Sequence, residues 1–561
     1  MDNRRLLLLI VFSFSLVMLW DAWQKYSQPK AASPAASSLA EAPAPKPSVN
    51  LHAPLPAPPP ATTAAASADK SETVTVRTDL FVAEVAKQGG DLVRLEFNAY
   101  KDSNNKAKNF ALFEARHQYL AQSGLIGEGL PNHKTLFSVT SGNRELAGDA
   151  RTVELRLEAP VSNGVKVTKI YTFTRDSYLI DVTHEIANGG EKEVAAHVYY
   201  QLQRDINPPE GESSMVSTFT GPAVYTDQEK FQKVDFADIE KGKARFASKA
   251  DNGWIAMVQH YFVAAWIPEA GLPREFYMRK LESSTQPVVS AGVIVPAPVA
   301  APGSKVAISV PIYAGPQIQV ILEQLAKPKA EGGMGAQGLP LVVDYGWLTV
   351  IAAPIFWCLE AINKMVGNWG WSIVLLTIAI KLLFFPLSAA SYKSMAKMRT
   401  VTPRLVALKE RYGDDRQKLN QEMMALYKRE KINPLGGCLP IAVQIPVFIA
   451  LYWALLGAVE IRDAPWILWI SDLSAADPYY VLPVIMVVTM LVQTKLNPTP
   501  PDPIQAKVMM MMPFIFGAMF FFFPAGLVLY WVVNNLLSIA QQWQITRMIE
   551  SGGKAANDSK I

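Results

Sequence analysis

The chain has few of the residues that usually carry metal, disulfide or nucleotide chemistry. Its 561 residues include two cysteines, Cys358 and Cys438, which lie far apart and in no spacing typical of a metal site. All six histidines precede residue 261. The nucleotide-binding pattern GxxxxGKS/T is absent. We therefore expect free thiols, no cofactor, no metal site and no nucleotide hydrolysis.

Charge is also scarce. Only 18% of the residues are charged, whereas 50% are hydrophobic. The formal net charge of +4 is too small to indicate binding to nucleic acid, and we expect no sequence-specific nucleic-acid partner. This composition is typical of a membrane protein that carries a water-soluble part.

The first 72 residues divide into an apolar segment and a Pro- and Ala-rich segment. Arg4 and Arg5 precede an apolar run, Leu6 to Trp20, and no small-residue cleavage pattern follows it. We therefore favour an uncleaved signal anchor over residues 1–28, with a cytoplasmic N-terminus, over a cleaved signal peptide. Residues 29–72 contain almost no large apolar side chains, so we expect a disordered tether outside the cytoplasm.

Residues 73–327 show the period-two alternation of strands, for example TVELRLEA at 152–159. Turn signals such as Asn163-Gly164 separate the alternating runs. Many short strands joined by hairpins predict an antiparallel β-sandwich, which would follow the anchor outside the cytoplasm. A short helix from Pro316 to Leu325 is expected to close this domain.

Five apolar segments in the C-terminal half are predicted to cross a bilayer, which takes about 20 mostly apolar residues. They are residues 367–388 and, within 435–545, residues 438–459, 479–495, 508–523 and 526–545. With the N-terminal anchor they make six transmembrane helices, of which the last five form one bundle.

The segment 389–434, between the first two of these five spans, is strongly basic. It carries eleven basic and five acidic residues, a net charge of +6 by subtraction, which marks it as cytoplasmic. Apolar residues recur at helical spacing on both sides of Gly413, which predicts a helical hairpin. A basic, Met-rich hairpin could meet anionic lipid, ribosomal RNA or a nascent chain.

The predicted sides of the membrane constrain the remaining segments. An outer β domain and a cytoplasmic hairpin require an odd number of crossings between them, and 367–388 supplies one. Residues 328–366, although nearly long enough to span, are therefore predicted to form a linker and an amphipathic helix on the outer interface. The loop 460–478 has four acidic residues and one basic residue and is expected outside, whereas the tail 546–561 is expected inside.

Lys381 lies near the middle of the predicted span 367–388. A charge at that depth costs about 2.5–3.5 kcal/mol on insertion scales, and such residues usually face a water-filled cavity or a partner. Snorkelling of the long side chain to the interface is the alternative. No acidic residue lies in the interior of any predicted span, so we expect the partner to be a group that arrives with a substrate.

Polar residues on the other predicted spans support a hydrated groove. The last span places Tyr530, Asn534, Ser538 and Gln541 on one helical stripe, at spacings of four, four and three. Thr377 lies one turn before Lys381, and Gln444 and Phe448 lie on a similar face of the second span. The alternative is that these polar residues only bond to one another and hold the bundle together.

Six motifs in the C-terminal half form a recognisable set. They are VDYGWL (343–348), GNWGWSI (367–373), SYKSMAKMR (391–399), GDDRQKLNQEMMALYKREKINPLGGCLP (413–440), DPYYVLP (477–483) and FPAGLVLYWVVNN (523–535). These motifs resemble those of the YidC family of membrane protein insertases, related to the Oxa-type and Alb-type insertases. Together with the anchor and the large outer domain, the resemblance covers the whole chain and is to Gram-negative members.

The resemblance implies a five-helix core around a hydrophilic groove that is closed on the outside, and a periplasmic β super-sandwich. It implies a multi-pass protein of the bacterial inner membrane, with both termini cytoplasmic and residues 29–366 periplasmic. The implied partners are nascent membrane proteins, the Sec translocon with its accessory subunits, the lipid bilayer and, through the hairpin and tail, the ribosome. By position, Lys381 replaces a usual arginine of the groove, and Tyr530 and Trp531 match an aromatic pair that contacts the incoming segment.

We therefore predict a membrane protein insertase and chaperone that is not an enzyme and acts alone or with the Sec translocon. One alternative is a transporter or channel that uses Lys381 as a counter-ion, but the chain has no internal repeat. Another is a carbohydrate-active enzyme in the β domain. It would need paired carboxylates, which the sequence does not identify, and we regard His184 and His197 as structural.

Overall fold

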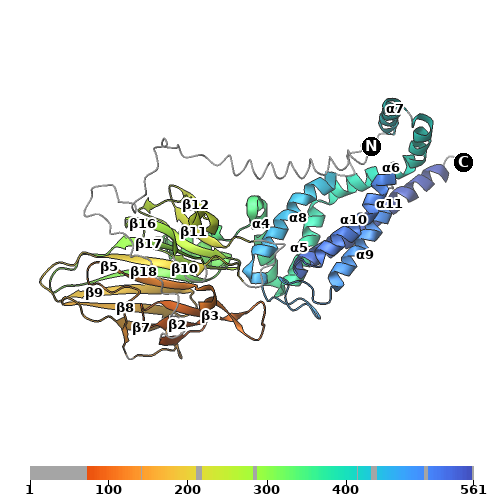
Figure 1. The fold of residues 1–561 in the computed structure, drawn as a ribbon. Coiled ribbons are helices and arrows are strands. Elements are labelled where there is room, and N and C mark those ends of the chain that lie inside the picture. Colours follow the sequence, from red (N-terminus) through yellow and green to blue (C-terminus); the bar gives the residue numbers. More distant parts are fainter. Residues whose placement is uncertain are drawn as a thin grey trace, which may run out of the picture. The chain divides into compact units, whose positions relative to one another are not determined.

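The computed structural model describes residues 72–140, 142–209, 218–281, 287–413, 415–430, 439–497 and 503–558 (Figure 1). The predicted signal anchor, nearly all of the predicted tether and Cys438 lie outside these ranges. Cys358 is a free thiol, as expected.

Within the described residues, the N-terminal part forms two antiparallel sheets of nine strands each. The first sheet has the order β1-β2-β3-β5-β10-β17-β16-β13, with β4 paired to β3. Its strands are β1 (Thr73–Arg77), β2 (Phe81–Ala86), β3 (Leu92–Lys101), β4 (Asn109–Phe113), β5 (Leu120–Ile126), β10 (His197–Asp205), β13 (Lys249–Ala250), β16 (Arg274–Leu281) and β17 (Val288–Pro296).

The second sheet has the order β12-β11-β14-β15-β18-β9-β8-β7-β6. Its strands are β6 (Ser138–Val139), β7 (Thr152–Glu158), β8 (Val165–Thr174), β9 (Leu179–Asn188), β11 (Gly221–Thr226), β12 (Lys230–Lys233), β14 (Trp254–Gln259), β15 (Phe262–Trp266) and β18 (Lys305–Pro316). Every pairing in both sheets is antiparallel, as the hairpin turns predict.

Alternating side chains build the core of these sheets. Along β7, alternate residues are buried, which is the pattern that the sequence shows. Asn163 and Gly164 both have positive φ (51° and 75°), the backbone of a tight two-residue hairpin turn between β7 and β8. Trp254 and Trp266 are fully buried. The predicted antiparallel β-sandwich is confirmed.

Short helices surround the sheets and lead to the helical part. They are η1 (Ala115–His117), α2 (Phe236–Glu240), α3 (Gln319–Ala326), η2 (Lys329–Glu331), η3 (Leu339–Val342) and η4 (Gly346–Leu348). The predicted closing helix at Pro316–Leu325 corresponds to α3, which begins later because Pro316 still belongs to β18.

The C-terminal half is helical and consists largely of apolar helices. Its elements are α4 (Thr349–Val366), α5 (Trp369–Leu383), α6 (Phe385–Tyr412), α7 (Arg416–Arg429), α8 (Leu439–Gly457), η6 (Val459–Ile461), α9 (Val481–Leu496), α10 (Pro503–Phe520) and α11 (Ala525–Asp558) (Figure 1). The predicted hairpin is present as α6 and α7, and α6 ends at the predicted break, with Gly413 as its C-cap. Helix α11 continues through most of the segment predicted as a tail.

The boundary between the first predicted span and the hairpin differs from the prediction. Helix α5 ends at Leu383, and α6 begins at Phe385 with a bend of 66° between them. Pro386 explains the break, because it lacks an N–H group and its ring would clash with a carbonyl one turn earlier in a continuous helix. The predicted span 367–388 is therefore α5 plus the first turn of α6.

Helix length alone does not separate spans from interfacial helices here. Among the described residues, α4 is the one unbroken helix that is long and apolar enough to cross a membrane, and α5 with the start of α6 passes as a bent pair. The apolar parts of α8, α9 and α10 are shorter. The predicted position of α4 on the outer interface therefore stays a prediction.

Candidate functional site

Four helices enclose a cavity of about 350 Å³ in the helical part. Every described residue that lines it is uncharged, and most of these residues carry a hydroxyl or an amide. The lining residues are Ser388, Ser391, Tyr392 and Met395 of α6, Gln444, Ile445 and Phe448 of α8, Met490, Gln493, Thr494 and Asn497 at the end of α9, and Tyr530, Trp531, Asn534, Asn535 and Ser538 of α11. We call this cavity the polar groove.

Six of the eight predicted site residues line the polar groove. Phe448 stacks on Tyr530, with ring centroids 6.1 Å apart and planes 16° apart. The Trp531 and Phe448 rings lie edge to face, with their centroids 4.7 Å apart. Gln444, Asn534 and Ser538 complete the six. The groove therefore has an aromatic wall beside a set of neutral hydrogen-bonding groups.

The other two predicted residues, Thr377 and Lys381, are buried in α5 and do not line the groove. The Thr377 hydroxyl donates to the carbonyl of Ile373 in its own helix at 2.6 Å. Lys381 is 3% exposed, and its Nζ donates to Ser538 Oγ at 2.7 Å. Lys381 thus has a neutral partner within the chain, which the sequence does not predict, and it meets the groove through Ser538.

The polar face of α11 is wider than the predicted stripe. Gln541, predicted to join the stripe, has a buried carbonyl oxygen without a hydrogen-bond partner among the described residues. Its neighbour Gln542 instead donates to the carbonyl of Leu496 (3.1 Å) and to Asn497 Oδ1 (3.2 Å). These bonds tie α11 to α9, which is the helix-tying role considered as the alternative for polar residues.

Sequence reasoning missed the groove residues of α6 and α9. Ser388, Ser391 and Met395 recur at spacings of three and four, which is one face of a helix. The spacing indicates this face, but Ser388 is the last residue of the predicted span, and Ser391 and Met395 fall in the predicted cytoplasmic hairpin. Because α6 begins at Phe385, its first turns still belong to the bundle and face the groove.

The loop between α8 and α9 covers the N-terminal ends of α5 and α11. Asn368, the N-cap of α5, donates to the carbonyls of Pro465 (3.2 Å) and Trp466 (3.3 Å). At the start of α11, the N–H groups of Ala525 and Gly526 bond to loop carbonyls at 2.7 and 2.9 Å. Helix N-termini leave unpaired N–H groups, so these bonds hold the loop over α11.

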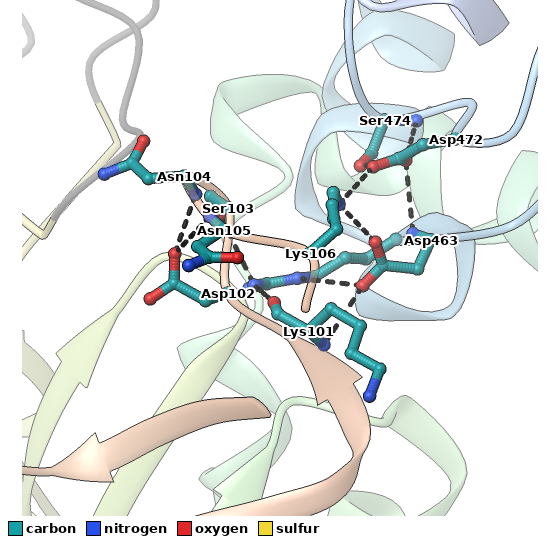
Figure 2. Close-up of polar contacts among 10 residues, drawn as sticks. Lys101, Asp102, Ser103, Asn104, Asn105, Lys106, Asp463, Asp472 and Ser474 are labelled. Carbon is teal, nitrogen blue, oxygen red and sulfur yellow. Dashed lines mark hydrogen bonds and ion pairs between the residues drawn. The ribbon is translucent and has the colours of Figure 1, made fainter. Parts of the chain in front are cut away.

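The same loop binds the β domain. Lys106, in the turn between β3 and β4, forms ion pairs with Asp463 and, at 3.0 Å, with Asp472 (Figure 2). Arg462 is almost fully buried and donates to the carbonyl of Lys101 at 2.6 Å. Its guanidinium also lies over the ring of Phe110, 4.9 Å from the centroid.

The charges of this contact are perturbed in ways that the geometry explains. Burial opposes the ionisation of Asp472, but hydrogen bonds from Ser474 and Lys106 outweigh it and hold the pKa of Asp472 below its ordinary value. Glu460 accepts a hydrogen bond from the Gln319 N–H at 3.3 Å, where α3 begins and lacks a side-chain cap of its own. Burial raises the pKa of Glu460 to about 7.

Apolar helices around a neutral polar groove, beside a buried lysine, are typical of a membrane protein. A family model described as the YidC periplasmic domain matches residues 73–358, and one described as 60Kd inner membrane protein matches residues 361–552. The chain belongs to the YidC family of membrane protein insertases. The predicted family is confirmed.

Two relatives show the extent of the similarity. A membrane protein insertase YidC of Dechloromonas aromatica is 64% identical over 100% of both chains. One of Aromatoleum aromaticum is 59% identical over 98% of both. A solved structure of an active YidC insertase has a TM-score of 0.41 at 18% identity, covering 84% of this chain and 92% of its own. The relatives are named as insertases rather than enzymes, so neither alternative function is favoured.

Proposed function

We propose that this chain inserts and folds proteins of the bacterial inner membrane by receiving their polar segments in the polar groove. The observation that carries the proposal is the 350 Å³ cavity lined by neutral hydrogen-bonding side chains within apolar helices. Burying a polar group without a partner costs about 2–7 kcal/mol. Hydroxyls and amides of the groove offset that cost for a segment on its way across the membrane, without nucleotide hydrolysis.

Lys381 adds a charge to this mechanism. Among the described residues no carboxylate pairs with it, so an acidic side chain of the client is its electrostatic complement. Phe448, Tyr530 and Trp531 offer an apolar wall to the hydrophobic part of the client. The energy of insertion then comes from burying the client's apolar residues and from the membrane potential.

The contact in Figure 2 supports the proposed topology. The loop 460–478 binds the β domain through Asp463 and Asp472, so both belong on one side of the membrane. An acidic loop and a basic hairpin on opposite sides agree with the charge bias of inner-membrane proteins. We infer a periplasmic location for residues 29–366, cytoplasmic termini, and six transmembrane helices including the N-terminal anchor.

The helical hairpin is the proposed cytoplasmic reception site. Val401, Leu405 and Leu426 form a small core between α6 and α7, and Arg404 bonds to Glu430 at 2.7 Å across the pair. The hairpin is thus a structured basic surface rather than a simple connector. We infer that it meets nascent chains and, with the tail, the ribosome, and that the chain also works beside the Sec translocon and its accessory subunits.

Site-specific crosslinking during translation tests the proposal. A photoreactive residue in place of Gln444, in the groove, should crosslink to nascent membrane proteins. The matched control is the same probe at Met510 of α10, whose side chain is 64% exposed on the surface of the helices. Equal crosslinking from both positions would mean that clients do not enter the groove.

A further inference from the structure

Lys381 is connected to the polar groove by one hydroxyl. The ammonium of Lys381 lies behind the groove wall at 3% exposure, and Ser538, 7% exposed, lies between them. The distance from Lys381 Nζ to Ser538 Oγ is 2.7 Å. No other hydrogen bond or ion pair of Lys381 occurs among the described residues, although an ammonium can donate three.

The Ser538 hydroxyl is fully oriented. It donates its proton to the carbonyl of Asn534 at 2.7 Å, one turn earlier in α11. Because this proton points to Asn534, the lone pairs of the hydroxyl oxygen point elsewhere, and the oxygen accepts a hydrogen bond from the Lys381 ammonium. The hydroxyl of Tyr392, from α6, also interacts with Ser538. Three helices, α5, α6 and α11, therefore meet at this single oxygen.

We propose that Ser538 is a positioning residue that holds the Lys381 ammonium at the groove wall and releases it to an acidic side chain of the client. This inference rests on the proposed function and adds a selectivity to it. The ammonium is a charged donor to either kind of acceptor, but a carboxylate adds the attraction between opposite charges, which a hydroxyl or an amide lacks. An Asp or Glu in the groove can therefore replace Ser538 as the acceptor, whereas an Asn or Gln competes with it on nearly equal terms.

Loss of the hydroxyl should remove this control. Without Ser538 Oγ, the ammonium loses the one hydrogen bond that it makes among the described residues, and the flexible lysine stem is free to turn away from the groove. Hydrogen bonds to charged groups contribute about 1.5–3 kcal/mol, so the preference for acidic clients should fall about tenfold or more.

The test uses the full chain in proteoliposomes and two clients that differ in one residue of the translocated segment, Asp or Asn. The readout is the ratio of the two initial insertion rates. Ser538→Ala and Ser538→Val should lower the Asp-to-Asn ratio about tenfold. Ser538→Thr keeps the hydroxyl and should keep the ratio, and it matches valine in shape, so the pair separates the hydroxyl from packing.

A second arm places Ser538→Ala in a Lys381→Met background, where it should cause no further change in the ratio. An unchanged ratio in both Ser538→Ala and Ser538→Val would overturn the inference. So would a further drop of the ratio in the Lys381→Met background. If Lys381→Met itself keeps the wild-type ratio, the charge mechanism of the proposed function fails as well, which distinguishes the two failures.

Discussion

Two lysines are buried in different regions of this chain, and their surroundings differ. Lys169, in the β domain, is fully buried and forms an ion pair with Asp91 at 3.9 Å. It also donates to the carbonyls of Gly89 and Ser123, at 3.2 and 3.1 Å. Lys381, in the helical part, is buried to nearly the same extent, but its one partner among the described residues is the Ser538 hydroxyl.

The difference supports a structural role for Lys169 and the proposed functional role for Lys381. Burial lowers the pKa of Lys169 and raises the pKa of Asp91, and the attraction between the two charges opposes both shifts. The β domain thus supplies its own counter-charge. Around Lys381 the described residues provide a hydrogen bond and no counter-charge, which leaves the ammonium able to attract an acidic group from outside.

The largest expected effect comes from breaking the pair in the β domain. Lys169→Ala leaves Asp91 buried without a cation and should destabilise the domain by about 3–5 kcal/mol. Thermal unfolding of the detergent-purified protein measures this. Lys166→Ala, in the same strand but half exposed, is the control and should cost at most about 1 kcal/mol. Equal effects of the two variants would show that the buried pair is not a structural element.

Glu460 is an acidic counterpart of Lys381, because it is partly buried and has no ion pair among the described residues. Its pKa is raised from an ordinary 4.5 to about 7 in the folded protein. Ionisation of Glu460 therefore lowers the free energy of unfolding, with no effect below about pH 4.5 and the full effect above pH 7. Glu460→Gln should therefore stabilise the protein by about 1–2 kcal/mol at pH 8 and have little effect at pH 5.

Unfolding temperatures across this pH range measure the effect of Glu460→Gln. Glu323→Gln, which removes an exposed carboxylate from α3, is the control and should not change the pH dependence. A stabilisation by Glu460→Gln that is larger at pH 5 than at pH 8 would contradict the assigned burial cost.

The smallest expected effect on stability is at Lys381 itself. Lys381→Met removes a charge that has no counter-charge among the described residues and leaves the bond from Ser538 to Asn534 intact. The change in unfolding free energy should stay within about 1 kcal/mol, since an apolar side chain of similar length fills the same space. A loss of unfolding free energy as large as that of Lys169→Ala would show that Lys381, like Lys169, is a structural residue.

Much of the fold follows from local patterns in the sequence. Alternation and turn residues predict the antiparallel sandwich, since each strand shows its buried face within a few residues. Helical spacing that is interrupted at Gly413 predicts the hairpin, and the basic charge of residues 389–434 predicts its cytoplasmic side. The break before α6 is harder to predict. A proline such as Pro386 is compatible both with a kink in one continuous helix and with the first turn of a new helix.

The site is predicted in part for a related reason. Spacing alone finds Tyr530, Asn534 and Ser538, which share one helical stripe. It cannot decide between Gln541 and Gln542, because one residue rotates a side chain by about 100° and the packing of α9 makes the choice. It also cannot find the bond between Lys381 and Ser538, because 157 residues separate the two in sequence.

The proposed insertion mechanism depends on the positive charge at position 381. The most direct test compares Lys381→Arg with Lys381→Ala in cells depleted of the wild-type protein, with growth and client insertion measured together. We expect Lys381→Arg to support growth and client insertion and Lys381→Ala to support neither. The two variants should accumulate in the membrane to the same level. Equal support by the two variants would contradict it.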